Sequence, residues 1–211
     1  MIASAISNFL AVHGVEAAGF VTTAVGIWLT TRRSMLCWPV ILAADVLYLA
    51  VFYQARLLSD ALLQIFFIAF TLYGWWNWWR GVQDDGEVKV VPLPMRNLVV
   101  ALLTGAVGSV MLGAIAVRMG AALPYLDATL ASYSLVASWW EARKHTANWW
   151  AWIVIDIVYV GEYWYKRLWL TGVLYGGLVV LAAIGLRAWR RAEKSDQTAA
   201  CTTLSSGSPA M

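Results

Sequence analysis

The sequence is poor in the residues that most enzyme sites require. Charged residues make up 13% of its 211 residues, and it contains only two histidines and two cysteines. Both histidines lie near predicted loops, so we expect no metal site within the fold. No glycine-rich phosphate loop and no nucleophile elbow occur, which argues against direct ATP hydrolysis. We therefore expect a protein that is not an enzyme and that needs neither a cofactor nor a nucleic-acid partner.

Long apolar runs take the place of these residues. Hydrophobic residues make up 61% of the chain, and a helix needs roughly 20 apolar residues to cross a bilayer. Seven runs approach this length: 14–31, 36–54, 60–79, 97–117, 121–140, 149–165 and 169–189. The sequence thus predicts an all-α polytopic membrane protein whose main partner is the lipid bilayer.

The positive charges are unevenly placed between these runs. With seven spans, most of the 15 lysines and arginines fall on one side of the membrane. Cytoplasmic loops carry such an excess, which places the N-terminus outside and the C-terminus inside the cell. The polar residues 193–211 have too little apolar surface to fold, and we expect them to form a disordered cytoplasmic tail.

Many residues recur after 111 positions. For example, Arg32, Trp38, Asp45, Tyr48 and Gly74 recur as Arg143, Trp149, Asp156, Tyr159 and Gly185. This offset spans four membrane crossings, so equivalent helices point the same way and the repeats are parallel. We expect a three-helix bundle in 1–80, a cytoplasmic loop and linker helix in 81–118, and a second three-helix bundle in 119–192. In the linker, Gly105, Gly108 and Gly113 predict close helix packing.

Two aspartates lie deep inside the predicted spans. Asp45 and Asp156 are each followed three residues later by a tyrosine on the same helix face, Tyr48 and Tyr159. Ionisable groups at this depth are costly and are functional candidates by default. The alternative is that each pair only holds the helices of its own repeat together.

Aromatic residues supply the second signal, since the chain has 14 tryptophans. Many would suit the membrane interface, where tryptophan is enriched. One helix face, however, carries Trp149, Trp152, Asp156, Tyr159 and Tyr163 in succession. Such a stripe could line a site for a flat, cationic aromatic ligand through ring stacking and cation–π attraction.

Other polar residues complete the predicted site. Gln64 and Tyr175 occupy equivalent repeat positions, and Gln64 needs a partner within its apolar run. We assign both to ligand binding, together with the five residues of the stripe. As gate or lining residues we expect Asp45, Tyr48, Trp75, Trp78, Asp127 and Ser134.

Three stretches of the sequence carry a family resemblance. They are Tyr73-Gly-Trp-Trp-Asn-Trp78, Asn148-Trp-Trp-Ala-Trp-Ile-Val-Ile-Asp156 and Tyr165-Lys-Arg-Leu-Trp-Leu-Thr-Gly-Val-Leu-Tyr175. They resemble the Pnu family of bacterial vitamin transporters, and most of all its nicotinamide riboside carriers. The family's paired-tryptophan motif matches Trp149 and Trp152, and its helix-three glutamine matches Gln64.

This resemblance implies a three-one-three fold similar to the SWEET sugar transporters, in the bacterial inner membrane. It also implies uptake of nicotinamide riboside, a phosphate-free vitamin, by facilitated diffusion, with a cytoplasmic kinase trapping the product. Thiamine or riboflavin is the alternative substrate. A membrane scaffold or sensory subunit is the alternative of another class. Ion coupling and the choice between a monomer and a homo-oligomer such as a homotrimer stay open.

Overall fold

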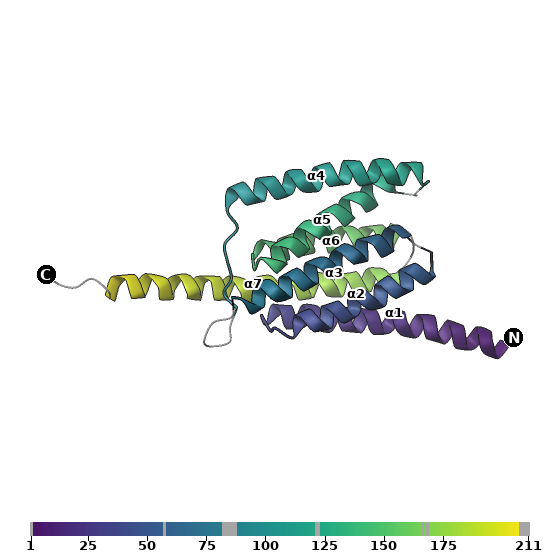
Figure 1. Ribbon diagram of the computed structural model, residues 1–211, viewed down its shortest axis with the longest axis horizontal. Helices are drawn as coiled ribbons and strands as arrows, with labels where there is room; N and C mark the ends of the chain where they lie inside the picture. Colours follow the sequence, from purple (N-terminus) through teal and green to yellow (C-terminus); the bar gives the residue numbers. More distant parts are fainter. Residues whose placement is uncertain are drawn as a thin grey trace.

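The computed structural model describes residues 2–56, 58–81, 88–120, 123–165, 167 and 169–206. The described residues form seven helices, each of which overlaps one of the seven predicted apolar runs, and none of them belongs to a named strand (Figure 1). The first helix begins at Ile2, well before the predicted run at 14–31. The helices are α1 (Ile2–Thr31), α2 (Cys37–Gln54), α3 (Leu58–Trp79), α4 (Met95–Arg118), α5 (Pro124–Ala142), α6 (Ala147–Tyr165) and α7 (Trp169–Ser206). The predicted all-α class is confirmed.

Proline sets the start of two helices. Pro94, in the extended region, is the N-cap of α4, and Pro124 occupies the first turn of α5. Proline suits these positions because the first turn of a helix has no internal partner for its N–H groups.

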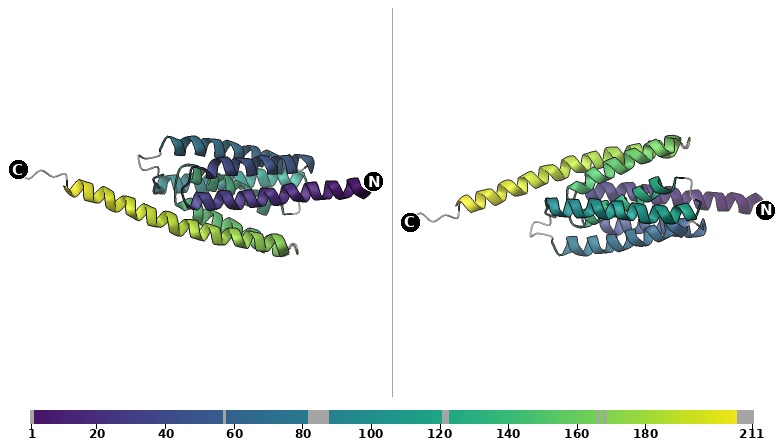
Figure 2. Two further views of the ribbon diagram at one scale, coloured as in Figure 1. Left: turned by 90° about the horizontal axis from the view of Figure 1, so that it is seen from below. Right: turned by 90° about the horizontal axis from the view of Figure 1, so that it is seen from above.

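The last helix is longer than the sequence predicted. Helix α7 continues to Ser206, so the prediction of disorder from residue 193 is wrong up to that point; residues 207–211 lie outside the described residues. The segment contains alanine, glutamate, lysine and glutamine, which extend a helix already nucleated by packing. Thr146 also donates a hydrogen bond to Glu193 at 3.0 Å. Figure 2 shows α1 and α7 projecting from opposite ends of the bundle.

The helices pack in a repeated order. Helices α1, α2 and α3 contact one another in succession, and so do α5, α6 and α7. The two groups meet where α3 contacts α5 and where α7 contacts α1. Among the described residues, helix α4 contacts no helix other than α5, and it lies at the edge of the bundle (Figure 1). We call residues 1–79 and 124–206 the first and second halves.

Residues 111 positions apart adopt the same geometry. The ring of Trp38 lies against Gly74, and the ring of Trp149 lies against Gly185. Four backbone positions with positive φ fall into two further equivalent pairs, Arg33 with Lys144 and Arg56 with Arg167. The two residues of each pair follow the ends of equivalent helices and adopt the left-handed conformation, which commonly terminates a helix.

The glycines of α4 lie where the sequence predicted close packing. A Cβ atom at Gly105 would lie 2.6 Å from the ring of Tyr133, and one at Gly113 would overlap the ring of Tyr125. The third glycine, Gly108, is in the same close contact with Ser132. These contacts let α4 approach α5 closely, as small residues do between membrane helices.

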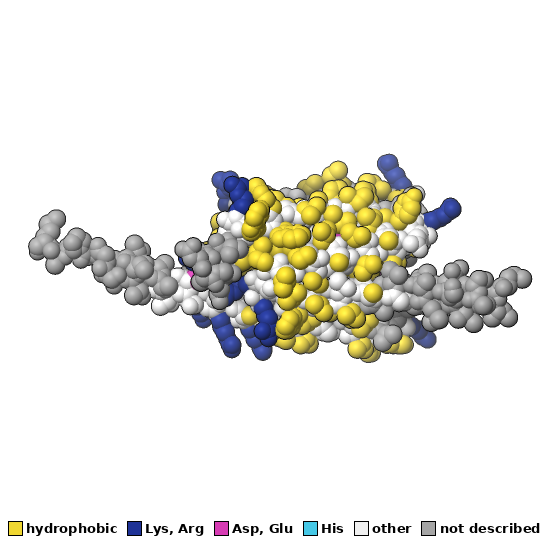
Figure 3. All heavy atoms as spheres, turned by 60° about the horizontal axis from the view of Figure 1, so that its bottom comes forward, with side chains coloured by type: hydrophobic (Ala, Val, Ile, Leu, Met, Phe, Trp, Pro, Cys, Tyr) yellow, Lys and Arg dark blue, Asp and Glu magenta, His cyan; other side chains and the backbone are white. Residues whose placement is uncertain are grey.

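Apolar side chains cover the outside of the bundle. Figure 3 shows hydrophobic side chains around the middle of the molecule, with lysine and arginine gathered at its two ends. On α4, Leu103 and Val110 are more than 60% exposed. Three described helical stretches are long and apolar enough to cross a membrane: Cys37–Gln54, Met95–Arg118 and Thr171–Asp196. This distribution matches a lipid-facing surface.

We predict that Gly185→Ala lowers the stability of the fold by about 1–3 kcal/mol, the usual cost of overpacking. The added methyl group would overlap the ring of Trp149. Thermal unfolding in detergent measures the effect. Gly176→Ala on the same helix is the matched control, because nothing lies within 4 Å of its new Cβ. An equal loss in both variants would contradict the packing role of Gly185.

Candidate functional site

A cavity of about 280 Å³ lies between the two halves of the bundle. All helices except α4 contribute to its wall. Ten pairs of lining residues are separated by 111 positions: Thr23/Ser134, Ile27/Ser138, Thr30/Glu141, Trp38/Trp149, Ile41/Trp152, Asp45/Asp156, Tyr48/Tyr159, Gln64/Tyr175, Phe67/Leu178 and Thr71/Ala182. The cavity therefore lies where equivalent faces of the two halves meet.

Most of the predicted site residues lie in this wall. The predicted residues that line it are Gln64, Trp149, Trp152, Asp156, Tyr159, Tyr175, Asp45, Tyr48 and Ser134. They come from five helices, so the fold brings together residues that the sequence separates by more than 100 positions. The shared polar character of these positions and their common face explain why the helical pattern found them.

Four predicted residues lie elsewhere. Tyr163 lies behind the wall, where its ring stacks on that of Tyr159 with the centroids 5.9 Å apart. Asp127 borders a separate groove beside α4, because it lies in the first turn of α5. Trp75 is 37% exposed on the outside of α3, because its neighbour Gly74 is the residue that faces the interior. As lining residues, these three are therefore not part of the cavity.

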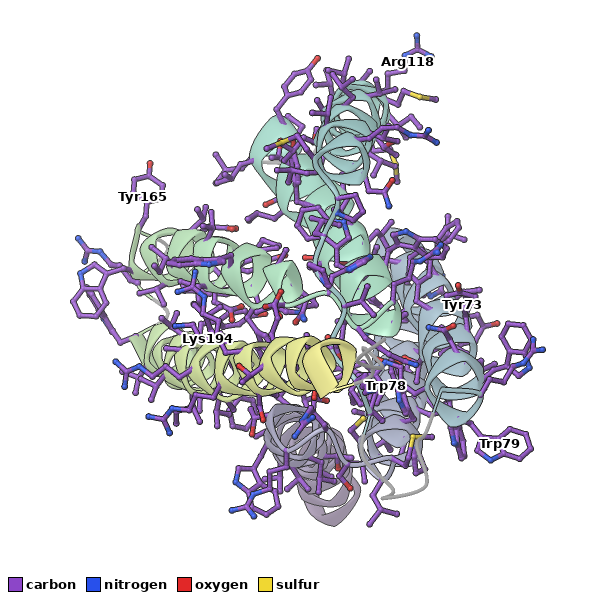
Figure 4. All side chains as sticks on the ribbon, turned by 90° about the vertical axis from the view of Figure 1, so that its left-hand side faces the viewer. Tyr73, Trp78, Trp79, Arg118, Tyr165 and Lys194 are labelled. Atoms are coloured by element: carbon purple, nitrogen blue, oxygen red, sulfur yellow. The ribbon has the colours of Figure 1, made fainter. Side chains whose placement is uncertain are left out.

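The fourth, Trp78, is fully buried at one end of the bundle, below the cavity. This end contains the α1–α2 and α5–α6 turns, and we call it the basic end. Its Nε1–H donates to the backbone oxygen of Glu141 at 3.1 Å, and the Nε1–H of Trp189 donates to that of Thr30 at 3.0 Å. The two indole rings meet with centroids 5.7 Å apart. Figure 4 shows Trp78 pointing into the bundle, whereas Trp79 points outward.

Three carboxylates face the cavity. Asp45 accepts a hydrogen bond from Thr71 at 2.8 Å, and Glu141 accepts one from the indole of Trp152 at 3.2 Å. Asp156 is 6% exposed and has no hydrogen-bond donor among the described residues. No lysine, arginine or histidine lies among the described residues that line the cavity. The wall is therefore negatively charged wherever these acids are ionised, and it favours a cation.

Several buried polar atoms in the wall have no hydrogen-bond partner among the residues that the structure describes. They are the Nε1 atoms of Trp38 and Trp149 and the Oε1 atom of Gln64, each on a side chain at most 9% exposed. Buried polar groups usually form hydrogen bonds, and an unpaired one costs free energy. A ligand with hydroxyl or amide groups could satisfy both the donors and the acceptor.

Two lining residues important for this chemistry were not predicted. Trp38 carries the same 111-residue offset as Trp149, and this signal could have identified it. Glu141 lies at the end of an apolar run next to Arg143 and Lys144, where a charged residue looks like an ordinary interface residue. Only the packing of α5 against α3 and α6 shows that its side chain enters the cavity.

The basic end is covered by the segment that precedes α4. Val91 N–H donates to the oxygen of Lys144 at 3.0 Å, and the Nδ1 atom of His145 donates back to the oxygen of Val91 at 3.0 Å. Burial lowers the pKa of His145 below its ordinary value, and Arg143 acts in the same direction. Burial also lowers the pKa of Lys144. The turn between α5 and α6 is thus held by a neutral histidine.

Comparison with known proteins gives one consistent relationship. The sequence model of a family described as nicotinamide mononucleotide transporter matches residues 13–191. The nicotinamide riboside transporter PnuC of Escherichia coli is 26% identical, over 83% of this chain and 84% of the relative. The riboflavin/roseoflavin transporter RibM of Streptomyces davaonensis is 31% identical, over 81% of this chain and 80% of the relative.

The fold also has a solved counterpart. The crystal structure of the vitamin B3 transporter PnuC matches with a TM-score of 0.70 at 20% sequence identity. The match covers 92% of this chain and 88% of the other. The two proteins therefore share a fold.

We predict that acid destabilises the α5–α6 turn through His145. Because its pKa is lowered in the folded state, the unfolded chain binds more protons near the ordinary histidine pKa of about 6.5, and stability falls as the pH falls through that range. Melting temperatures measured between about pH 7.5 and pH 5.5 should decrease. The decrease should be smaller in His145→Gln, and an equal decrease in both proteins would refute the role of His145.

We also predict that the cavity is accessible to water. In a protein with Cys37 and Cys201 replaced by alanine, Ser134→Cys should react with a small charged maleimide, since Ser134 lines the cavity. Ser109→Cys is the control. Ser109 is equally buried but donates to Gly105 within α4 and does not line the cavity. Failure of Ser134→Cys to react would favour a sealed scaffold over a transporter.

Proposed function

The chain belongs to the nicotinamide mononucleotide transporter family, and from this premise we propose that it carries nicotinamide riboside into the cell by facilitated diffusion. At the level of the family it is a multi-pass membrane protein that transports a small vitamin. The substrate, the direction and the passive mechanism are the proposal.

The observation that carries the proposal is the composition of the cavity wall. Nicotinamide riboside has a flat, positively charged pyridinium ring with an amide group, joined to a ribose with several hydroxyl groups. Trp149 and Trp152 would stack on the ring, and Asp156 would lie close to its charge. Gln64 has an unpaired oxygen that would accept from the amide or a ribose hydroxyl.

The size and charge of the cavity fit a phosphate-free ligand. Its volume of about 280 Å³ is slightly below that of typical ligand pockets, which measure about 300–1,000 Å³. A phosphate group would bring negative charge next to three carboxylates without a lysine or arginine among the described lining residues. The wall therefore favours the nucleoside over its phosphorylated form, and phosphorylation in the cytoplasm would trap the product.

We further propose that the two halves are parallel three-helix repeats joined by α4, with the N-terminus outside and the basic end in the cytoplasm. The equivalent contacts of residues 111 apart support the first part. The distribution of lysine and arginine supports the second. In this arrangement, the contact between Trp78 and Trp189 closes the cytoplasmic end of the cavity and would have to open for release.

Riboflavin is a second candidate substrate. The riboflavin/roseoflavin transporter is more similar to this chain, at 31% identity, than the nicotinamide riboside transporter is, at 26%. Riboflavin has a larger three-ring system without a positive charge. It would gain no attraction from the carboxylates of the wall, and it suits the small volume of the cavity less well than nicotinamide riboside does. We therefore place it second.

The test is uptake of labelled nicotinamide riboside, thiamine and riboflavin into proteoliposomes. We predict saturable uptake of nicotinamide riboside that stops when the internal and external concentrations are equal. Trp152→Ala should weaken its binding about tenfold, because a cation–π contact contributes about 1–2 kcal/mol. Tryptophan fluorescence quenching measures the affinity in detergent.

The surface residue Trp79 provides the matched control, since it is 71% exposed and points away from the bundle. Trp79→Ala should bind and transport like the wild type. Accumulation against a concentration gradient when a proton or sodium gradient is applied would contradict facilitated diffusion. Uptake of riboflavin alone would replace the proposed substrate by the second candidate.

A further inference from the structure

The two walls of the cavity differ at a pair of positions that are in contact. In the second half, the Nε1–H of Trp152 donates to the Oε2 atom of Glu141 at 3.2 Å. The equivalent positions of the first half, also in the wall, are occupied by Ile41 and Thr30. Isoleucine cannot donate a hydrogen bond, and Thr30 carries no charge; its hydroxyl donates to Gly26 within its own helix at 3.0 Å and also interacts with the Glu141 carboxylate. The carboxylate and its indole partner are therefore present together in one half and missing together from the other.

The other two acids of the wall do not distinguish the two halves. Asp45 and Asp156 are equivalent to each other and place a carboxylate in each half. Glu141 adds a third negative charge that has no charged equivalent in the first half. Its carboxylate lies next to the ring of Trp152 and also interacts with Thr30 and Asp45 of the first half. Its field is therefore strongest for a charge that lies against that ring.

The side chain and the backbone of Glu141 form different hydrogen bonds. The backbone oxygen accepts the hydrogen bond from Trp78 that closes the basic end. This bond does not depend on the side chain, so helix packing alone does not require a carboxylate at this position. Burying an acid between helices is costly unless it gains an interaction in return.

We propose that Glu141 is a specificity-determining residue, which makes the Trp152 wall prefer a cationic ring over a neutral ring of the same shape. The hydrogen bond holds the indole plane in place, and the carboxylate adds negative potential where the positive ring would stack. The inference rests on the proposed function, since it assigns the charge preference of the same site to one side chain.

The experiment compares two ligands that differ chiefly in charge. Nicotinamide riboside is a cation, and its 1,4-dihydro form is neutral with the same ribose and amide groups. Calorimetric titration of the full-length protein in detergent gives both dissociation constants. The wild type should bind the cation more tightly. The Glu141→Gln variant keeps an oxygen that can accept the Trp152 hydrogen bond. In this variant, binding of the cation should weaken about tenfold, or about 1.4 kcal/mol. Binding of the neutral form should weaken less than binding of the cation.

Two further variants separate charge from structure. Glu141→Asp restores the charge and should recover most of the preference for the cation. Glu193→Gln removes a carboxylate that bonds Thr146 outside the cavity and should leave both affinities as in the wild type. Melting temperatures of all variants show whether the fold is intact. If Glu141→Gln does not fold, the comparison of Glu141→Asp with Trp152→Phe, which removes the donor but keeps a ring, carries the test.

The outcomes separate the inference from the proposed function. An unchanged ratio of the two affinities in Glu141→Gln, or an equal weakening for both ligands, would overturn the inference and leave the proposed function standing. If the wild type binds neither form, the proposed function fails. In that case, binding of the cation thiamine that weakens about tenfold in Glu141→Gln would still support the inference, whereas binding of riboflavin alone, or of no ligand, would overturn it.

Discussion

Two tryptophan N–H groups, each bonded to the main chain of the opposite half, hold the basic end of the bundle together. Trp78 bonds Glu141 and Trp189 bonds Thr30, and the two rings touch each other. Leaving an indole N–H unpaired in an apolar interior costs free energy, and for these two rings the other half supplies the partner. The same rings stand edge-on against Trp38 and Trp149, and these in turn require glycine at positions 74 and 185. The tight packing of this end and the floor of the cavity follow from these two bonds.

The lipid environment decides where polar side chains can lie. A helix surface that faces hydrocarbon must be apolar, as most exposed residues of α4 are, so polar groups collect on the faces that turn inward. Because the two halves have equivalent inward faces, the polar groups meet in pairs around one cavity. The two halves differ only where a pair is unequal. Thr71 donates a hydrogen bond to the Asp45 carboxylate. Its equivalent in the second half, Ala182, cannot donate the corresponding bond to Asp156.

Periodicity and repetition made most of the fold predictable. Seven apolar runs became seven helices, and the glycines of α4 lie at close contacts, because both features depend on local composition. Side-chain direction was harder. Four tryptophans follow one another at the end of α3, but only Trp78 points inward, which depends on the rotation of the helix against Trp38. Glu141 and the end of α7 were missed for a related reason, since neighbouring helices, and not their own composition, determine their environments.

A bundle built from two separate copies of one three-helix chain would present two identical walls to its ligand, and the ligand could bind equally well either way round. In this protein both halves belong to one chain, so Trp152 and Glu141 of one half correspond to Ile41 and Thr30 of the other. Under the proposed function, a molecule with a charged ring at one end and a sugar at the other would then have a single favourable orientation in the cavity. On the same proposal, the ring and the sugar would leave the protein in a fixed order, which the orientation of the bound ligand sets before the cytoplasmic end opens.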